Sequence, residues 1–103
     1  DYSGSLSIDQ TLMEAAGFLH HEKILVGNIA NGERFETYCI PADHGSGEIG
    51  LNGAAAHKGK PGDPLVIMTF INLNPEEAAV WEPRLVIVSN NNKSFELVSS
   101  PNS

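Results

Sequence analysis

The chain has 103 residues, of which 41% are hydrophobic and 18% are charged, so we expect one globular domain with a thin core. The net charge is −7, and the six Lys plus Arg residues are not clustered, which argues against a nucleic-acid partner. The single cysteine excludes an intrachain disulfide and suits a cytoplasmic location, and no apolar stretch approaches the roughly 20 residues of a membrane span.

The first half of the chain predicts short elements separated by tight turns. Residues 3–8 are expected to be extended, and a helix over 9–16 follows, with Asp9 as its N-cap and Gly17 at its end. Asn31-Gly32 between two strand-like runs predicts a hairpin that joins strands at 23–30 and 33–40, the second ended by Pro41. A loop, a short strand and a small helix are expected at 42–47, 48–51 and 54–57.

The second half predicts further strands. The continuous apolar run at 65–73 is typical of a central strand, and Asn74 with Pro75 predicts the start of a short helix. Strands at 84–89 and 94–98 flank an Asn-rich turn. The sum predicts a mainly β fold, a small closed barrel with short helices, as one domain over 1–103.

Gly4-Ser5 is the first motif with chemical potential. A serine hydroxyl can attack the carbonyl of the preceding residue when the backbone is flexible or strained, as glycine allows, and when a donor stabilises the oxyanion. Elimination from the resulting ester, followed by hydrolysis, would leave a pyruvoyl group at residue 5. Taken alone, the dipeptide is far more typical of a flexible turn than of a cleavage site.

The return strand of the hairpin is the second motif. Alternation puts Arg34 and Tyr38 on one face and Thr37 on the other. Arg34 can bind a carboxylate with two hydrogen bonds, and Tyr38 can donate a proton in an enclosed site. The alternative is a polar face turned to solvent. A bulge, strong twist or neighbouring subunit would be needed to bring Thr37 to the same site.

The third motif is Asn52-Gly53-Ala54-Ala55, where a strand meets a helix. Small residues at that junction let a ligand or another backbone approach, and free N–H groups favour an anion. The alternative is an ordinary Asn cap. No metal site is expected, because the adjacent His20 and His21 would face opposite ways on a strand and no Cys or carboxylate cluster accompanies them.

The three motifs, in this order and spacing, resemble the aspartate 1-decarboxylase family, whose members make β-alanine for pantothenate. The family pattern is matched by Tyr-Ser-Gly-Ser at 2–5, Ile-Asp at 8–9, Asn-Gly-Glu-Arg-Phe-Glu-Thr-Tyr at 31–38 and Asn-Gly-Ala-Ala-Ala at 52–56. Gly62-Asp63 before the apolar run fits as well. The resemblance extends from residue 2 to about residue 84, and less specifically to the end.

The resemblance implies a role for each matched residue. Ser5 would become the pyruvoyl cofactor after cleavage from Gly4, and it would hold the substrate as a Schiff base without PLP or a metal. Thr37 would donate to the oxyanion during cleavage, and Tyr38 would protonate the substrate carbon. The substrate, L-aspartate, would be bound by residues of the second and third motifs: Arg34, Asn52, Gly53, Ala54 and Ala55.

The resemblance also implies a double-psi β-barrel, a homotetramer with sites at subunit contacts, and a leading segment before Asp1 that this chain is expected to lack. Whether a maturation partner takes part stays open. Two alternatives remain: a non-catalytic double-psi barrel that binds another protein, and a pyruvoyl enzyme with a different amino-acid substrate. Arg34 favours an acidic substrate without fixing which one.

Overall fold

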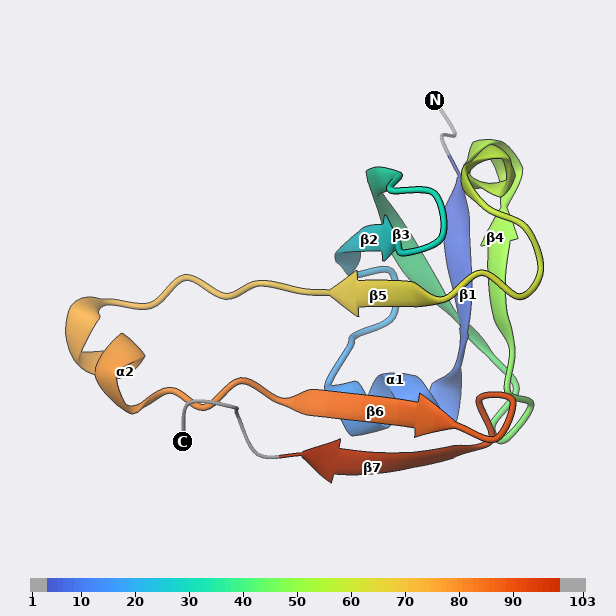
Figure 1. The fold of residues 1–103 in the computed structure, drawn as a ribbon. Helices are drawn as coiled ribbons and strands as arrows, with labels where there is room; N and C mark the ends of the chain where they lie inside the picture. Colours follow the sequence, from blue (N-terminus) through green and yellow to red (C-terminus); the bar gives the residue numbers. More distant parts are fainter. Residues whose placement is uncertain (1–3, 99–103) are drawn as a thin grey trace.

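The computed structural model describes residues 4–98 as a mainly β protein with short helices (Figure 1). No helix within these residues has the length and apolarity to cross a membrane. The elements in chain order are β1 (Ser5–Asp9), α1 (Gln10–Ala16), β2 (Lys23–Asn28), β3 (Arg34–Ala42), β4 (Ile49–Asn52), the 3-10 helix η1 (Gly53–Lys58), β5 (Leu65–Met68), α2 (Pro75–Val80), β6 (Leu85–Ser89) and β7 (Ser94–Val98).

The strands form a five-stranded sheet in the order β4-β1-β3-β2-β5 and a separate β6-β7 hairpin. β1 runs parallel to β3 and antiparallel to β4, while β2 is antiparallel to both β3 and β5. The mainly β class is therefore confirmed. Within residues 4–98, however, the hydrogen-bonded ladder ends at β4 and β5 and does not close into a barrel.

Local signals at the helix ends are confirmed. The Asp9 side chain caps α1 by accepting a hydrogen bond from Thr11 N at 2.8 Å, and Gly17 ends the helix in the left-handed conformation at φ 81°. Asn74 and Glu77 form a reciprocal capping box at the start of α2. α1 thus begins and ends where its capping residues predict, and α2 begins where Asn74 and Pro75 predict.

The prediction that Pro41 ends the hairpin's return strand is wrong. β3 continues to Ala42, and Pro41 pairs with Ile8 of β1. The ladder between β2 and β3 stops at Tyr38, so no hydrogen bond to β2 requires an N–H group at residue 41. Proline is tolerated where a strand lacks a hydrogen-bonding neighbour on one side.

The prediction of a central strand over 65–73 is also wrong. β5 holds only four residues and lies at the edge of the sheet. Leu65 and Ile67 pack against the core, but the chain then leaves the sheet, and Phe70 is 75% exposed. A continuous apolar run is typical of a strand that is covered on both faces. Here Val66 of β5 is 44% exposed, and the chain leaves the sheet after Met68.

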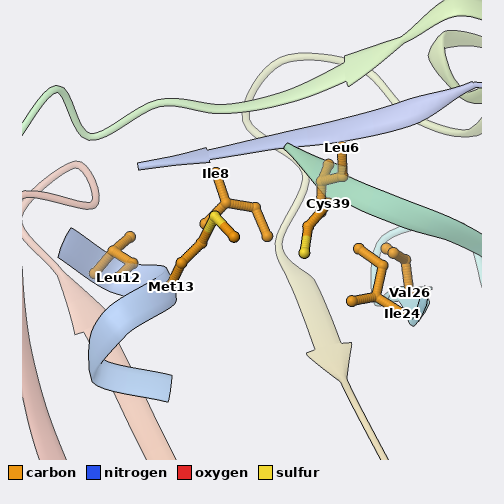
Figure 2. Close-up of a cluster of buried hydrophobic side chains, with 7 residues drawn as sticks. All are labelled: Leu6, Ile8, Leu12, Met13, Ile24, Val26 and Cys39. Carbon is orange, nitrogen blue, oxygen red and sulfur yellow. The ribbon is translucent and has the colours of Figure 1, made fainter. Parts of the chain in front are cut away.

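The core lies between the sheet and α1, as Figure 2 shows. Alternation along β1 sends Leu6 and Ile8 into this core, while Ser5, Ser7 and Asp9 project from the opposite face of the strand. The core side chains come from β1, α1, β2 and β3 and are Leu6, Ile8, Leu12, Met13, Ile24, Val26 and Cys39. β1 therefore anchors one face in the core and presents a polar second face.

Candidate active site

The polar face of β1 is buried along its whole length. Ser5, Ser7 and Asp9 are 2%, 8% and 1% exposed. Buried hydroxyl and carboxylate groups need hydrogen-bond partners, because an unpaired polar group loses its hydration without compensation. The hydrogen-bond partners of this face come from segments that are distant in sequence, so these hydrogen bonds hold those segments against β1.

Asp9 holds the loop at the far end of β1. Its carboxylate accepts hydrogen bonds from Gly45 N and Gly47 N, both at 2.9 Å, in addition to Thr11 N. Burial alone would raise the pKa of Asp9, but these backbone N–H donors outweigh burial and lower its pKa below 3.8. Asp9 therefore acts structurally, tying the loop before β4 to the start of α1.

Gly4 sits in a backbone conformation that only glycine adopts readily. Its φ is 120°, and a Cβ atom placed there would lie 2.7 Å from Ala55 N and 2.8 Å from Asn52 O. Both of those atoms belong to backbone and cannot rotate away. The peptide before Ser5 is consequently held between the end of β4 and the start of η1.

Thr37 meets the carbonyl of Gly4. Its hydroxyl donates a hydrogen bond to Gly4 O at 2.7 Å in a buried environment. Parallel pairing of Leu6 with Cys39 brings this part of β3 beside the start of β1. Thr37 thus reaches the Gly4 carbonyl through strand pairing, with its side chain on the buried side of β3, as alternation predicts.

Asn52 meets the serine side chains. It pairs with Ser5 in the ladder between β1 and β4, and its Nδ2 donates to Ser5 Oγ at 3.1 Å and to Ser7 Oγ at 2.8 Å. Asn52 occupies the N-cap position of η1, but its side chain makes no capping hydrogen bond. The alternative interpretation as an ordinary Asn cap is therefore wrong, because the amide faces β1.

The remaining predicted site residues take no part in the contacts just described. Arg34 is exposed at the beginning of β3, opposite Gly27, and lines a cavity of about 330 Å³ at the turn end of the β2–β3 hairpin. Tyr38 is half-buried, with its ring centroid 6.1 Å from that of His21. Gly53 and Ala54 are exposed on η1.

Within a single chain, some of the predicted site residues therefore form one cluster, and Arg34 and Tyr38 lie outside it. The cluster comprises Gly4, Ser5, Thr37, Asn52 and Ala55. It places a buried hydroxyl directly after a carbonyl that already accepts a short hydrogen bond from Thr37. Such a donor can stabilise negative charge on that carbonyl oxygen during nucleophilic attack. Within the described residues, no group of three or more His, Cys, Asp or Glu residues is placed to hold a metal ion.

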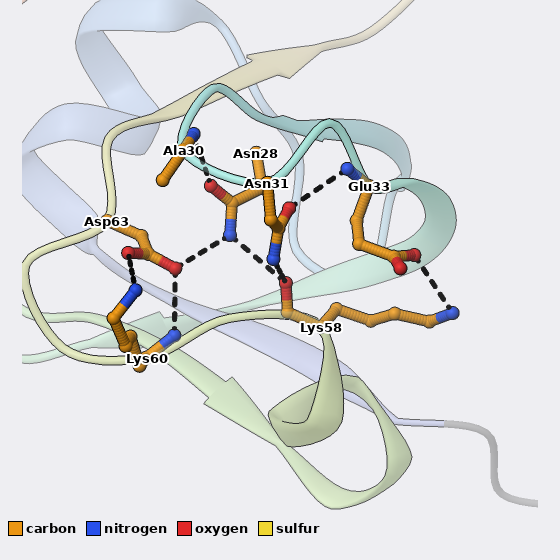
Figure 3. Close-up of polar contacts among 7 residues, drawn as sticks. All are labelled: Asn28, Ala30, Asn31, Glu33, Lys58, Lys60 and Asp63. Carbon is orange, nitrogen blue, oxygen red and sulfur yellow. Dashed lines mark hydrogen bonds and ion pairs between the residues drawn. The ribbon is translucent and has the colours of Figure 1, made fainter.

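A polar network that the sequence did not reveal fixes the loop after η1 (Figure 3). Buried Asn28 donates from Nδ2 to Lys58 O at 3.0 Å and to Asp63 Oδ2 at 2.9 Å. Asp63 Oδ2 also accepts from Lys60 N at 3.0 Å. The hydrogen bonds from Asn28 and Lys60 lower the pKa of Asp63 to about 2. The network ties the hairpin that carries Arg34 to the segment that follows η1.

Sequence reasoning also missed Ser7 as a neighbour of the cluster. The signal was present, because residues two apart on a strand project to the same side, so Ser7 lies beside Ser5. Asp9 was predicted only as a helix cap, and its hold on the loop at 45–47 depends on tertiary contacts.

Comparison with known proteins places the chain in a family. The family model described as aspartate decarboxylase matches residues 1–95. Proteins named aspartate 1-decarboxylase are 52% identical in Chlorobium chlorochromatii over 95% of this chain and 78% of the relative, and 50% identical in Acaryochloris marina over 93% and 73%. A relative of the same name in Neisseria meningitidis is 46% identical over 96% and 78%. This chain belongs to the aspartate decarboxylase family.

Proposed function

We propose that this protein decarboxylates L-aspartate to β-alanine and CO₂, the step that supplies β-alanine for pantothenate, by means of a pyruvoyl group made from its own Ser5. Family membership supports the carboxy-lyase activity. The observation that carries the self-processing part is the hydrogen bond of 2.7 Å from the Thr37 hydroxyl to Gly4 O, next to the buried hydroxyl of Ser5.

The processing step begins with attack of Ser5 Oγ on the carbonyl carbon of Gly4. The Oγ–C bond forms as the hydroxyl proton leaves, the bond from that carbon to the nitrogen of Ser5 breaks, and the nitrogen takes up a proton, which gives an ester. Thr37 stabilises the charge that develops on Gly4 O. The constrained backbone at Gly4, whose φ is 120°, raises the energy of the uncleaved peptide and so lowers the barrier to attack.

Elimination completes the cleavage. The Cα–H proton of Ser5 is removed, its Cβ–Oγ bond breaks, and the Gly4 carboxylate leaves with the electron pair of that bond. One water then hydrolyses the resulting dehydroalanine, so that ammonia departs and a ketone remains at residue 5. Atoms balance over the sequence with one water consumed and one ammonia released, and no external oxidant is needed.

The residues around Ser5 fit a pyruvoyl group at that position. When formed, the group supplies a carbonyl that takes the substrate amine and accepts the electron pair released with CO₂. Asn52 Nδ2 already lies 3.1 Å from the Ser5 oxygen and can hydrogen-bond an oxygen there. The small residues Gly53, Ala54 and Ala55 leave room for the substrate and offer backbone N–H groups beside it.

The two residues outside the cluster have roles that suit their chemistry. The Arg34 guanidinium binds the side-chain carboxylate of aspartate with two parallel hydrogen bonds and disfavours substrates that lack it. Tyr38 donates a proton to the carbon that has lost CO₂. Arg34 precedes Thr37 by three residues and opens onto the cavity at the hairpin.

We further propose that the working form is a homotetramer of double-psi β-barrels, located in the cytoplasm. The cavity that Arg34 lines includes none of the residues clustered around Ser5, which supports a site completed at a contact between copies. The exposed apolar side chains of β6 and β7 support an assembly that covers them. Ile87 and Leu97, for example, are 48% and 62% exposed.

The test is release of CO₂ from aspartate by the purified full chain. Ser5→Ala is expected to abolish it, and Arg34→Ala is expected to lower kcat/KM about 100-fold or more, because the substrate carboxylate would lose its bidentate partner. Arg84→Ala removes the only other arginine of the chain and is the matched control, with activity near wild type. Equal activity of the Arg34 and Arg84 variants would contradict the proposed role of Arg34, and activity in Ser5→Ala would contradict the pyruvoyl mechanism.

A further inference from the structure

We infer that Ser7 is a positioning residue for self-cleavage: its hydroxyl anchors the Asn52 amide so that the NH₂ group of Asn52 faces the attacking oxygen of Ser5. The inference rests on the proposed function, since it concerns the same cleavage between Gly4 and Ser5. It adds a residue for which neither the sequence motifs nor the family resemblance suggested a role.

Strand geometry places the three residues together. Ser5 and Ser7 project from the same side of β1, and Asn52 pairs with Ser5 on the antiparallel strand β4. The residue that pairs with Ser7 is Gly50, which has no side chain of its own to occupy the space above Ser7. The Asn52 side chain can therefore lie along β1 and contact both serines.

The distances indicate which contact is the anchor. Asn52 Nδ2 lies 2.8 Å from Ser7 Oγ and 3.1 Å from Ser5 Oγ, so the shorter hydrogen bond is to Ser7. Both hydroxyls are nine-tenths or more buried, and bulk water does not compete for the amide. A primary amide has two N–H groups, which is enough for one hydrogen bond to each serine.

Orientation of this amide matters for the chemistry. As Ser5 loses its proton and attacks, negative charge develops on Oγ before the new bond is complete, and an N–H donor stabilises that charge. The reversed amide would present its carbonyl oxygen, which stabilises the protonated hydroxyl and so opposes attack. Without the Ser7 hydroxyl, one N–H of Asn52 loses its partner and the amide is less firmly held in the productive orientation.

The experiment follows the cut from its start, by synthesising the full chain in a cell-free reaction and measuring intact and cleaved masses over time. Ser7→Ala is expected to slow cleavage about three- to tenfold, the size expected for one lost hydrogen bond. Asn52→Ala is expected to slow it more. The double variant should cleave as slowly as Asn52→Ala alone, because Ser7 acts only through Asn52.

Two controls separate positioning from a general loss of structure. Ser7→Thr keeps the hydroxyl and is expected to cleave within about threefold of the wild type, below the full effect of losing the hydrogen bond. Ser46→Ala removes an exposed hydroxyl that accepts a hydrogen bond from Glu48 N, and should leave the rate unchanged. Thermal unfolding midpoints of all variants are compared in parallel. A Ser7→Thr variant as slow as Ser7→Ala would overturn the inference, as would full additivity of the two alanine substitutions.

Cleavage of the wild-type chain distinguishes failure of the proposed function from failure of the role of Ser7. If the wild type is not cut at all, the proposed function fails and takes this inference with it. If the wild type is cut and Ser7→Ala is cut at the same rate, the proposed function stands and only the role of Ser7 is overturned.

Discussion

The part of the chain up to β5 (the first region) and the part that follows it (the second region) differ in how far their apolar side chains are buried. Within the described residues, every buried residue lies between Gly4 and Ala55. Residues 69–98, which hold α2, β6 and β7, are as rich in apolar side chains but leave them exposed: Phe70 is 75%, Val80 is 80% and Leu97 is 62% exposed. The first region builds its own core, and the second does not.

The second region is joined to the first by few polar contacts. Arg84 Nη1 donates to Ala15 O at 3.3 Å, and Asn92 Nδ2 donates to Gly47 O at 3.2 Å. Figure 1 shows the chain leaving β5, turning through α2 and returning along β6 beneath the sheet. A groove of about 1530 Å³, lined by Leu51, Leu65, Leu85 and other residues, separates the two regions.

The residues of the cleavage cluster and the exposed apolar surface therefore belong to different regions of the chain. The cluster around Ser5 uses only residues of the first region, each held by strand pairing or by backbone packing. Exposed apolar surface on this scale is typical of an interface. We therefore expect substitutions in the first region to affect cleavage, and substitutions in the second to affect assembly.

The largest effect is expected for Gly4→Ala. A side chain at φ 120° is strained, and its Cβ would overlap backbone atoms of Asn52 and Ala55, so the peptide must move from its place beside Thr37. We expect cleavage to slow by at least about 100-fold and the free energy of unfolding to fall by about 2–3 kcal/mol. Cleaved mass against time and urea unfolding measure the two quantities.

Gly27→Ala is the matched control for that change. Gly27 lies in β2 with open space at the Cβ position, so the added methyl group meets nothing within 4 Å. This variant is expected to cleave and unfold like the wild type. If the two alanine variants cleave at the same rate, the account of the constrained peptide is wrong.

The next effect is expected for Thr37→Val, which keeps the branched shape but removes the donor to Gly4 O. Loss of one oxyanion donor slows such reactions by about 100-fold or more. Stability should fall by about 1–3 kcal/mol, because the carbonyl is left buried without that donor. Thr37→Ser retains the hydroxyl and should cleave far faster than the valine variant; cleavage of the valine variant at the wild-type rate would exclude the role of Thr37.

A smaller effect on the single chain, but a clear one on assembly, is expected for Ile87→Glu. Ile87 is already 48% exposed, so its replacement should change the unfolding free energy of one chain by no more than about 0.5 kcal/mol. A charge buried at a contact between copies should instead shift the molar mass in solution from that of the proposed tetramer toward smaller species. Light scattering after size-exclusion chromatography measures this.

Leu19→Glu serves as the control for assembly, since Leu19 is 70% exposed but belongs to the first region. The comparison of the two regions predicts an unchanged molar mass for this variant. An assembly that tolerates Ile87→Glu and is lost with Leu19→Glu would contradict the assignment of the interface to the second region.

The smallest effect is expected in the acid range. The pKa of Asp63 is lowered to about 2 in the folded chain, from an ordinary value of 3.8, by its hydrogen bonds from Asn28 and Lys60. A carboxyl group with a lowered pKa stabilises the fold above its unfolded pKa, and that contribution is lost as the pH falls from about 4 toward 2. Asp63→Asn should therefore weaken the fall of the urea midpoint over that range, and an unchanged pH dependence would contradict the assignment.

Much of the first region could be predicted from the sequence because its signals are local. Asn31-Gly32 marks the hairpin, and Asp9 and Gly17 mark the ends of α1. The motif residues Gly4, Ser5, Thr37 and Asn52 were identified, although their contacts depend on the parallel pairing of β1 with β3 and on the antiparallel pairing with β4.

The errors arose where tertiary context decides. The apolar run at 65–73 gave no sign that the chain would leave the sheet after Met68, and Pro41 is tolerated only because β2 ends its pairing at Tyr38. The Asn28 network joins positions 30 and 35 residues apart, a separation at which no local pattern acts. The apolar sequence of β6 and β7 predicted strands but not what they face.

Whether Ser5 cleaves its own backbone is decided by the mass of the full chain under denaturing conditions after incubation. We expect two fragments, one ending at Gly4 and one beginning at residue 5 with a blocked end that reacts with carbonyl reagents. A single uncut mass that persists through the incubation would contradict the claim that the Ser5 hydroxyl attacks its own backbone.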